Sequence, residues 1–544
     1  MDEAKSSKWG KTSKADRSKL QVKTAPDTSF APGTRQYALL SRNEPPDDSE
    51  YPFIHSLILD ADAQLARIDQ RISKAQKKLK RLEEERASVL GIRARNKAIV
   101  SPLRRMPPEV LGEIFSWTLP SIREEMDRRR FDMAASPWVL ARISSHWRAV
   151  SLSIPSLWSR VVVDYSQGHV PSSSYPRALI QAQFQRAKNL KIHFYGCEIV
   201  SNSRPQIQMF QLLLQYSSRW EELCLGLTSE ILALIAPLRD RFSSLERLWI
   251  QWDRSKSQPL TGFLGCFQTA RTLIDVGILN EYRFVPISFP THQLTRYHLD
   301  APWREHARIL RLAQNLVEAH IRVDFDGEPW PASNEPIDLS GLRRLYVSHL
   351  EILDFLKAPV LEGLAFWVER DDLSDILLIL EAFVDRSACP LRRLYLKGSP
   401  DSHATTHILR SLPSVIELVI GHDVSGREAK KRVTALMTAL NPSSTPSRVT
   451  GIIAPHLALL ILACREENDI DYTAYFQMVK ERWEAAAYAL HTTKLLIQSG
   501  LQPDPETLAG LHTLQQNGLD FSLLEGSAAF MEMNIGMYAA SWML

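Results

Sequence analysis

The chain has 544 residues, of which 44% are hydrophobic and 23% are charged. This length exceeds what one hydrophobic core can organise, so we expect two or more structural units. Lysine and arginine together number 65 against 62 aspartates and glutamates, which gives a formal net charge of +3. A charge so close to balance gives no reason to expect nucleic acid or a membrane surface as the partner.

Cysteine usage and hydropathy predict a protein of the cytoplasm or the nucleus. The most apolar stretch, 452–464, is interrupted by Pro455 and His456 and is too short to cross a bilayer. The first thirty residues hold no apolar signal-peptide region. The cysteines lie far apart and form no C-x-x-C pair, as is typical of buried thiols in a reducing compartment; they are Cys197, Cys224, Cys266, Cys389 and Cys464.

The N-terminal region divides into a polar tail and a helix. Residues 1–53 are expected to be disordered, because they are too poor in large apolar groups to offset the entropy of ordering. Residues 54–99 carry apolar positions alternately three and four residues apart, which predicts one apolar seam along a helix. We expect either a self-associating coiled coil or a single helix that folds back on the next domain. The seam comprises Ile58, Ala61, Leu65, Ile68, Ile72, Ala75, Leu79 and Leu82, and it resumes at Val89 after Arg86.

Residues 100–165 predict a small all-α bundle. Pro107 and Pro108 preset the first turn of a helix, and Glu109 lies near its positive end. The apolar face of the first helix is formed by Val110, Leu111, Ile114 and Phe115. A second helix begins near Pro137 and carries Trp138, Leu140, Ile143 and Trp147. The block ends with Ile154, Leu157 and Trp158. So short a segment cannot bury all these side chains by itself. Another protein or the following repeats should therefore cover some of them.

Residues 166–470 repeat one motif: an apolar residue, two mostly polar ones, an apolar residue, any residue and an apolar residue. The clearest copies begin at Leu245, Leu342 and Leu391, and weaker ones begin at Trp220, Leu294, Leu316, Leu361, Val415 and Leu457. Their spacing of roughly twenty to thirty residues is that of leucine-rich repeats. The asparagine expected after each strand is mostly missing, so the repeats are degenerate. We expect an α/β solenoid with amphipathic helices between its strands, and the alternative is an unrelated α/β domain.

Residues 471–544 predict a helical cap. Residues 473–500 read as one long helix and 506–516 as another. The end of the chain holds Met531, Met533, Met537, Met543 and Trp542. Such a segment can offer an adaptable binding face for a partner, but we expect it to close the open end of the solenoid.

Alignment of the repeat copies predicts two columns of side chains on the concave face, opposite the core leucines. Aromatic and arginine side chains are often the energetic contacts of interfaces, so we expect this face to capture an unknown protein substrate with acidic or phosphorylated groups. The alternative is that the arginines are solvated and pair with neighbouring carboxylates, for example at Glu222 and Glu318. The first column holds Trp249, His298, His320, Tyr346 and Tyr395, and the second holds Arg247, Arg296, Arg344 and Arg393.

Motifs of catalysis and cofactor binding are missing from the sequence. It contains no Gly-rich phosphate loop, no G-x-S-x-G elbow, no H-E-x-x-H and no clustered Cys/His set. Histidines such as His298 and His320 stand singly on predicted strands. We therefore expect no catalytic residue, no cofactor and no metal site.

The block at 100–165 resembles an F-box, in the form common in mushroom-forming fungi, where a predicted coiled coil precedes the motif and leucine-rich repeats often follow it. The resemblance rests on Met106-Pro107-Pro108-Glu109-Val110-Leu111, Ile114-Phe115, Pro137-Trp138, Leu140, Ile143, His146-Trp147-Arg148 and Ile154-Pro155…Leu157-Trp158. Methionine stands at position 106 where the family usually has leucine, Ile143-Ser144-Ser145 replaces the frequent Val-Cys-Arg, and the charged stretch 123–130 is longer than the minimal motif.

The resemblance implies a function for the whole chain. F-box bundles pack against the Skp-type adaptor of a cullin–RING ubiquitin ligase, so the chain would be a non-catalytic substrate receptor whose repeats hold the substrate. The alternative is a coiled-coil and repeat scaffold that acts outside any ubiquitin ligase. By position, the adaptor-facing surface would be formed or supported by Met106, Pro107, Val110, Ile114, Leu140, Ile143 and Trp147.

Overall fold

The structure is a computed structural model, and its chain divides into two compact units, 1–106 and 107–544. It describes residues 32–536 except 43–44, 129, 169–173, 200–201, 261, 324, 326–329, 332–334, 369–372, 399–401, 424, 443–452, 486, 488 and 501–504. The protein is α/β, with a helical N-terminal region followed by a large parallel sheet.

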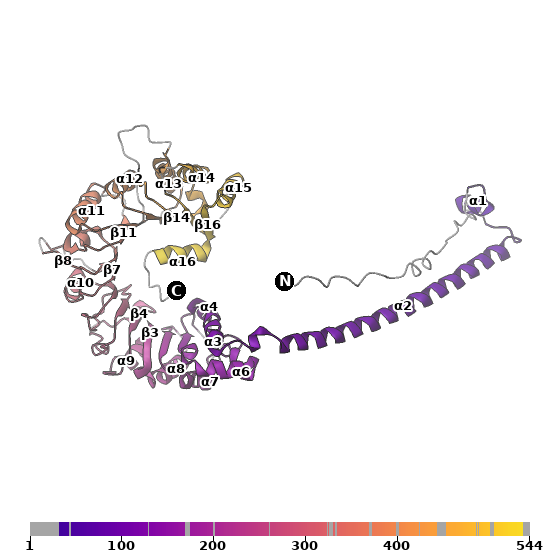
Figure 1. The fold of residues 1–544 in the computed structure, drawn as a ribbon, viewed down its shortest axis with the longest axis horizontal. Helices are drawn as coiled ribbons and strands as arrows, with labels where there is room; N and C mark the ends of the chain where they lie inside the picture. Colours follow the sequence, from indigo (N-terminus) through magenta and orange to yellow (C-terminus); the bar gives the residue numbers. More distant parts are fainter. Residues whose placement is uncertain are drawn as a thin grey trace, which may run out of the picture. The chain divides into compact units, whose positions relative to one another are not determined.

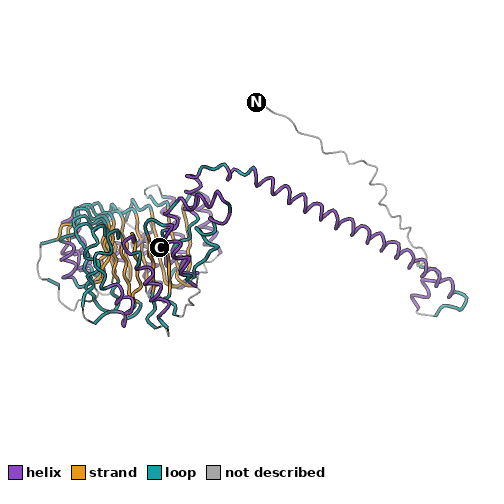
Figure 2. The backbone as a smooth tube through the Cα atoms, turned by 90° about the horizontal axis from the view of Figure 1, so that it is seen from below, coloured by secondary structure: helices purple, strands orange, loops and turns teal. Residues whose placement is uncertain are grey.

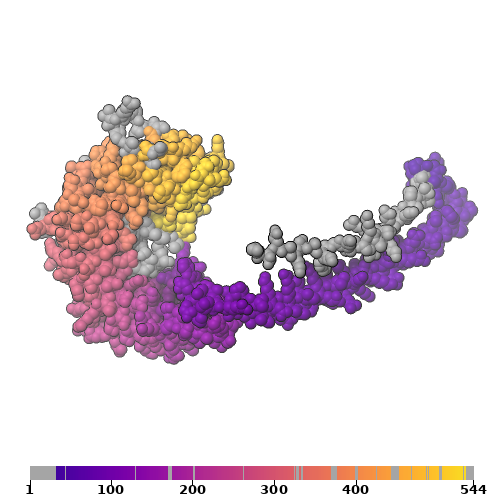
Figure 3. Space-filling view, in the orientation of Figure 1, coloured from indigo at the N-terminus to yellow at the C-terminus, as the bar shows by residue number. Residues whose placement is uncertain are grey.

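The first unit is built around one long helix. After the short helix α1 (Arg35–Arg42), α2 (Tyr51–Ile99) runs for 49 residues and passes through Gly91 without a break. Figure 2 shows it as one continuous helix, and in Figure 3 it is a single rod. A short 3-10 turn, η2 (Pro102–Arg104), ends the unit.

The disordered tail predicted for 1–53 is wrong for part of its length. Residues 1–31 lie outside the described residues, but α1 and the first turn of α2 fall within the predicted tail. Local polar contacts supply the order that the composition does not suggest. The Arg35 guanidinium pairs with Glu50 at 2.9 Å, and Pro52 stands in the first turn of α2, where a missing N–H costs nothing.

The second unit begins with the helical block. Its elements are α3 (Pro108–Trp117), α4 (Ile122–Arg128), α5 (Leu140–Ile143), α6 (Ser145–Ser153) and the 3-10 helix η3 (Pro155–Trp158). The second predicted helix is broken at Ser144, whose backbone is extended and whose hydroxyl accepts a hydrogen bond from the Trp147 N–H at 3.1 Å. Ser144 therefore caps α6 and ends α5. Phe115 of α3 is fully buried and lies 4.9 Å from the Trp147 ring, which joins α3 to α6.

Within the described residues, fourteen strands form one parallel sheet in which each strand pairs with the next along the chain. The strands β8 (Ile337–Asp338) and β10 (Leu356–Lys357) form a separate pair. The strands of the large sheet are β1 (Arg160–Asp164), β2 (Leu190–Tyr195), β3 (Trp220–Leu227), β4 (Arg247–Trp252), β5 (Asp275–Ile278), β6 (Arg296–Asp300), β7 (Glu318–Arg322), β9 (Arg344–Val347), β11 (Gly363–Val368), β12 (Arg393–Gly398), β13 (Glu417–His422), β14 (Leu459–Glu466), β15 (Thr492–Ser499) and β16 (Asp520–Glu525).

Helices line the outer side of the curved sheet, and α16 (Gly526–Gly536) lies on its inner side (Figure 1). The three clearest sequence copies place their second and third apolar residues in β4, β9 and β12, with the side chains buried on the helix side. The remaining helices are α7 (Arg177–Arg186), α8 (Arg204–Leu214), α9 (Ser229–Ile235), α10 (Trp303–Leu310), α11 (Leu373–Ser387), α12 (Ser402–Ser411), α13 (Arg427–Leu440), α14 (Tyr472–Glu484) and α15 (Pro505–Gln516), with 3-10 helices at Ser217–Arg219, Ser255–Ser257, Leu350–Phe355 and Glu467–Asp469.

The helical cap predicted for 471–544 is wrong in part: α14 and α15 lie where helices were predicted, but each is followed by a strand. The predicted helix over 473–500 ends at Glu484, and β15 and β16 extend the sheet beyond it. A short apolar run such as Leu495-Leu496-Ile497 fits a helix or a strand equally well in sequence. The free edge of β14 decides between them, because it supplies backbone hydrogen bonds along the whole of β15. Residues 537–544 lie outside the described residues.

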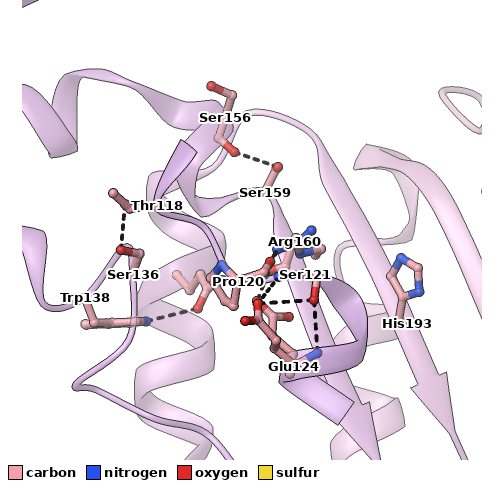
Figure 4. A network of polar contacts seen from close by, with 12 residues as sticks. Thr118, Pro120, Ser121, Glu124, Ser136, Trp138, Ser156, Ser159, Arg160 and His193 are labelled. Carbon is pink, nitrogen blue, oxygen red and sulfur yellow. Dashed lines mark hydrogen bonds and ion pairs between the residues drawn. The ribbon is translucent and has the colours of Figure 1, made fainter. Parts of the chain in front are cut away.

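The helical block is joined to the first strand by polar contacts. The Arg160 guanidinium of β1 donates to the Pro120 carbonyl, and the hydroxyls of Thr118 and Ser136 lie 2.8 Å apart (Figure 4). Arg160 also pairs with Glu125 of α4. The Trp138 indole N–H donates to Gln183 of α7 at 3.2 Å. These contacts tie α3, α4 and the loop before α5 to the edge of the sheet.

An aromatic clamp strengthens the same junction. Trp138 and Trp158 meet edge to face at 5.1 Å, and both are buried. The Arg186 guanidinium of α7 lies 4.6 Å from the Trp138 ring centroid and 4.3 Å from that of Trp158. A cation held over two aromatic faces in a partly desolvated position stabilises the docked block.

We predict that Arg186→Ala lowers the free energy of unfolding by about 1–2 kcal/mol, because the contacts with both indole rings are lost. Urea unfolding followed by tryptophan fluorescence measures the change. Gln185→Ala on the exposed face of the same helix is the control and should leave the midpoint in place. Equal midpoints for both variants would show that the clamp contributes nothing.

Candidate interaction surfaces

Helix α3 has two apolar faces, and only one of them is buried in the chain. Leu111, Gly112 and Phe115 pack inward. Val110, Ile114 and Trp117 recur at steps of four and three, which places them on one side of the helix. Their exposed fractions are 48%, 39% and 82%. We call these three residues the docking face.

Exposed apolar groups on one helix side are unusual when they include a tryptophan, and they mark a surface that another molecule can cover. The indole N–H of Trp117 donates to the Glu113 carboxylate at 3.3 Å, which holds the ring along the helix. Trp117 was missed among the predicted adaptor-facing residues. Its spacing from Ile114 was the signal that could have identified it.

The other predicted adaptor-facing residues fall into different environments. Pro107 is exposed and Ile143 is 54% exposed, so both are accessible. Leu140 is buried, and Trp147 is partly buried against Phe115, so these two support the bundle from inside. Met106 is partly buried and belongs to the first unit.

The predicted aromatic column lies in one row of the sheet, opposite the leucine core. Pairing between strands aligns Trp249 with Gly277, then His298, His320 and Tyr346. The row continues through Ala365 to Tyr395. The Trp249 ring extends over Gly277 to reach His298 at 5.1 Å between ring centroids, and His298 stacks on His320 at 4.8 Å. His320 in turn lies 5.3 Å from Tyr346.

The expectation that this column is exposed for substrate capture is wrong. Trp249, His320, Tyr346 and Tyr395 are buried, and His298 is partly buried. Covering segments explain the burial at both ends of the row. Met533 and Ala529 of α16 pack over Tyr395, whose hydroxyl donates to the Met533 carbonyl at 3.2 Å.

At the other end, Met126 of α4 packs against a cluster formed by Tyr195, Cys224 and Trp249. Helix α4 also contacts β1, through the ion pair between Glu125 and Arg160. Both covering helices come from segments that the repeat motif does not include.

The predicted arginine column is paired with carboxylates, as its alternative interpretation supposed. Neighbouring strands carry opposite charges in the same register, because Asp275 and Glu318 stand between arginines and Glu222 stands beside Arg247. The four arginine side chains are 28–45% exposed. The pairs are Arg247–Glu222 at 3.3 Å, Arg296–Asp275 at 3.3 Å, Arg296–Glu318 at 3.3 Å, Arg344–Glu318 at 2.6 Å and Arg393–Glu417 at 2.9 Å.

Burial and pairing act against each other at Glu222. Burial by itself would raise the pKa of this carboxyl, but the hydrogen bond from His193 at 2.8 Å and the charges of His193, Lys191 and Arg247 together lower it. Glu222 is therefore ionised in the folded chain. Its contribution to stability is present above its unfolded pKa and is lost when acid protonates the folded carboxyl.

The histidines of the aromatic row are neutral at physiological pH. Burial, helped by the charge of Arg322, lowers the pKa of His298 to about 3, and burial likewise lowers the pKa of His320. Neither ring nitrogen of His298 has a hydrogen-bond partner among the described residues. Two stacked, neutral imidazoles fit a packing role better than a charged one.

The described residues contain no group of three or more His, Cys, Asp or Glu side chains that could hold a metal ion. Four of the cysteine thiols are buried, and burial raises the pKa of Cys224 and of Cys266 to about 12. No helix in the described part of the chain has the length and apolar character needed to span a membrane.

The chain matches no protein-family model and has no significant match among curated proteins.

We predict that acid destabilises the fold partly through His298. Between about pH 6.5 and pH 3 the unfolded chain binds a proton at this residue and the folded chain does not, so stability falls as the pH falls. The loss is about 1.4 kcal/mol per pH unit. His298→Phe should reduce the difference between urea midpoints at pH 7 and pH 5. Exposed His512→Phe, as control, should keep the wild-type difference.

We also predict that Gly277→Ala destabilises the chain by about 1–3 kcal/mol, because an added Cβ would lie only 2.0 Å from the Trp249 ring. Gly421→Ala on β13 is the matched control, since its nearest neighbour would be 3.6 Å away. Thermal unfolding of both variants tests the packing of the row. A Gly277→Ala midpoint equal to that of Gly421→Ala would contradict it.

Proposed function

We propose that this chain is the non-catalytic substrate receptor of a Skp–cullin–F-box ubiquitin ligase. The observation that carries the proposal is the docking face, where Val110, Ile114 and Trp117 stand bare on a helix whose other side is packed. Covering the exposed part of these side chains removes apolar surface from water, which favours contact with a Skp-type adaptor. The F-box resemblance of 100–165 names the partner class.

We propose further that the sheet and its outer helices form a degenerate leucine-rich-repeat solenoid. Parallel strands that pair in chain order, with helices lining the outer side of the curved sheet, support this architecture (Figure 1). Because the aromatic row is buried or partly buried and its two ends are covered by α16 and α4, substrate capture is assigned to the row of arginines. Arg247, Arg344 and Arg393 are the most exposed of these, and an acidic or phosphorylated segment can share them with their carboxylates.

In this function the receptor performs no bond chemistry. The adaptor and cullin bring a charged ubiquitin-transfer enzyme, and the receptor raises the local concentration of substrate lysines near it. The contacts of Arg160, Trp138 and Arg186 with the helical block matter here, since they keep the docking face in a fixed relation to the first strands.

We predict that Val110→Ala combined with Ile114→Ala lowers recovery of the Skp-type adaptor and cullin in affinity purification at least tenfold, a loss of about 1.4 kcal/mol or more. Leu260→Ala combined with Leu378→Ala removes apolar groups that are even more exposed, from other parts of the second unit, and should leave recovery unchanged. Mass spectrometry of the retained proteins provides the measurement.

Two outcomes would contradict the receptor proposal. One is a wild-type chain that retains no Skp-type adaptor, and the other is a docking-face variant that retains as much as wild type. A chain that self-associates without any adaptor would instead be the scaffold.

A further inference from the structure

Helix α2 presents an uncovered apolar seam along most of its length. All of α2 is described, and none of its residues is buried. The large seam side chains are 47–63% exposed: Ile58, Leu65, Ile68, Ile72, Leu79, Leu82 and Val89. Most helices in proteins owe their stability to packing of such a face, so a long helix with a bare seam calls for an occupant.

The width of the seam indicates one partner helix. In heptad terms, Ile58, Leu65, Ile72 and Leu79 occupy position a, and Ala61, Ile68, Ala75, Leu82 and Val89 occupy position d. Apart from Leu57 at position g and Leu90 at position e, the flanks of the seam are charged or polar: Arg71, Lys78 and Glu85 stand at position g, and Asp62, Asp69 and Glu83 stand at position e. A strict a/d stripe between charged flanks is the narrow seam of a two-stranded coiled coil.

Charge complementarity selects a second copy of this chain as that partner. In a parallel, in-register pair, Lys78 of each copy faces Glu83 of the other, so the two-fold symmetry supplies two attractive pairs. The remaining e and g residues meet neutral groups: Arg71 faces Gln76, and Glu85 faces Leu90. No like charges meet on the flanks of this arrangement.

An antiparallel pair is disfavoured by the same residues. The antiparallel register that overlaps the whole seam places Leu65 against Leu82 and Ile72 against Ala75 of the other copy. On its flanks Arg71 then faces Lys78, and Asp62 faces Glu83, each twice. Like charges at these positions oppose association.

We infer that α2 forms a parallel, in-register coiled coil with a second copy of this chain. The interface consists of the a and d residues from Ile58 to Val89, and Arg86 is its one charged layer. The dimer does not depend on adaptor docking and holds for the receptor and the scaffold alike. It joins two substrate-binding units, so a target with two binding segments is held more tightly than by either copy alone.

The test uses the full chain with single cysteines added. Leu79→Cys lies at position a, where parallel pairing sets the two introduced thiols side by side, whereas antiparallel pairing sets each against Ile68. Under mild oxidation Leu79→Cys should give a covalent dimer on a non-reducing gel. Lys77→Cys, on the opposite side of the helix, and the wild-type chain should give none. Absence of the Leu79→Cys cross-link would overturn the inference.

A second variant tests the register without relying on a disulfide. In the parallel dimer the Arg86 side chains of the two copies meet at position a and repel each other. Arg86→Leu should therefore lower the dissociation constant at least tenfold in analytical ultracentrifugation. In the antiparallel register Arg86 faces Ala61, and the change would be small. An unchanged constant, or a wild-type chain with the mass of a monomer at micromolar concentration, would show the inference to be wrong.

Discussion

Parallel, in-register pairing places equivalent residues of successive strands in the same row of a sheet. In this protein the rows on the helix side hold leucine, isoleucine and valine, and they form the continuous core of the second unit. On the inner side, each side chain of a row lies next to another member of the same row on the adjacent strand, so the members of a row must pack or pair with one another. The row containing Trp249 meets this requirement by stacking rings, and the row containing Arg296 meets it by alternating charge.

The alternation of charge has a consequence for recognition. Arg296 lies between Asp275 and Glu318 and pairs with both. Two carboxylates hold it in place, and neither occupies all of its donors. A guanidinium has several donors in a plane, so it can keep one carboxylate while it binds another. The arginine row can therefore remain ordered in the free chain and still accept a further acidic group.

The helical block and the first strands behave as one body because polar and aromatic contacts cross between them. Arg160 reaches back to the Pro120 carbonyl, and Arg186 reaches forward to Trp138 and Trp158. These contacts bury the inner side of the block and leave the docking face of α3 outside. In α2, likewise, none of the side chains of the apolar seam is buried. In both helices the apolar residues that the fold does not use define the candidate interfaces.

The sequence by itself determined the local elements with strong periodicity. The seam from Ile58 to Leu82 predicted α2 to within three residues at its start, and the proline pair at 107–108 predicted α3. The repeated motif located β4, β9 and β12 and assigned their leucines to the core. Each of these signals lies within a few neighbouring residues, so it can be recognised without knowing how the rest of the chain folds.

Only the tertiary structure decided what covers the inner face and where the sheet ends. Periodicity shows that Tyr395 and Trp249 point away from the leucines, but it cannot show that Met533 and Met126, far away in sequence, pack against them. Likewise, residues 492–499 became a strand because β14 offered an unpaired edge. Burial of the inner face and pairing of the last strands depend on contacts between segments that are far apart in sequence. A local sequence pattern does not contain this information.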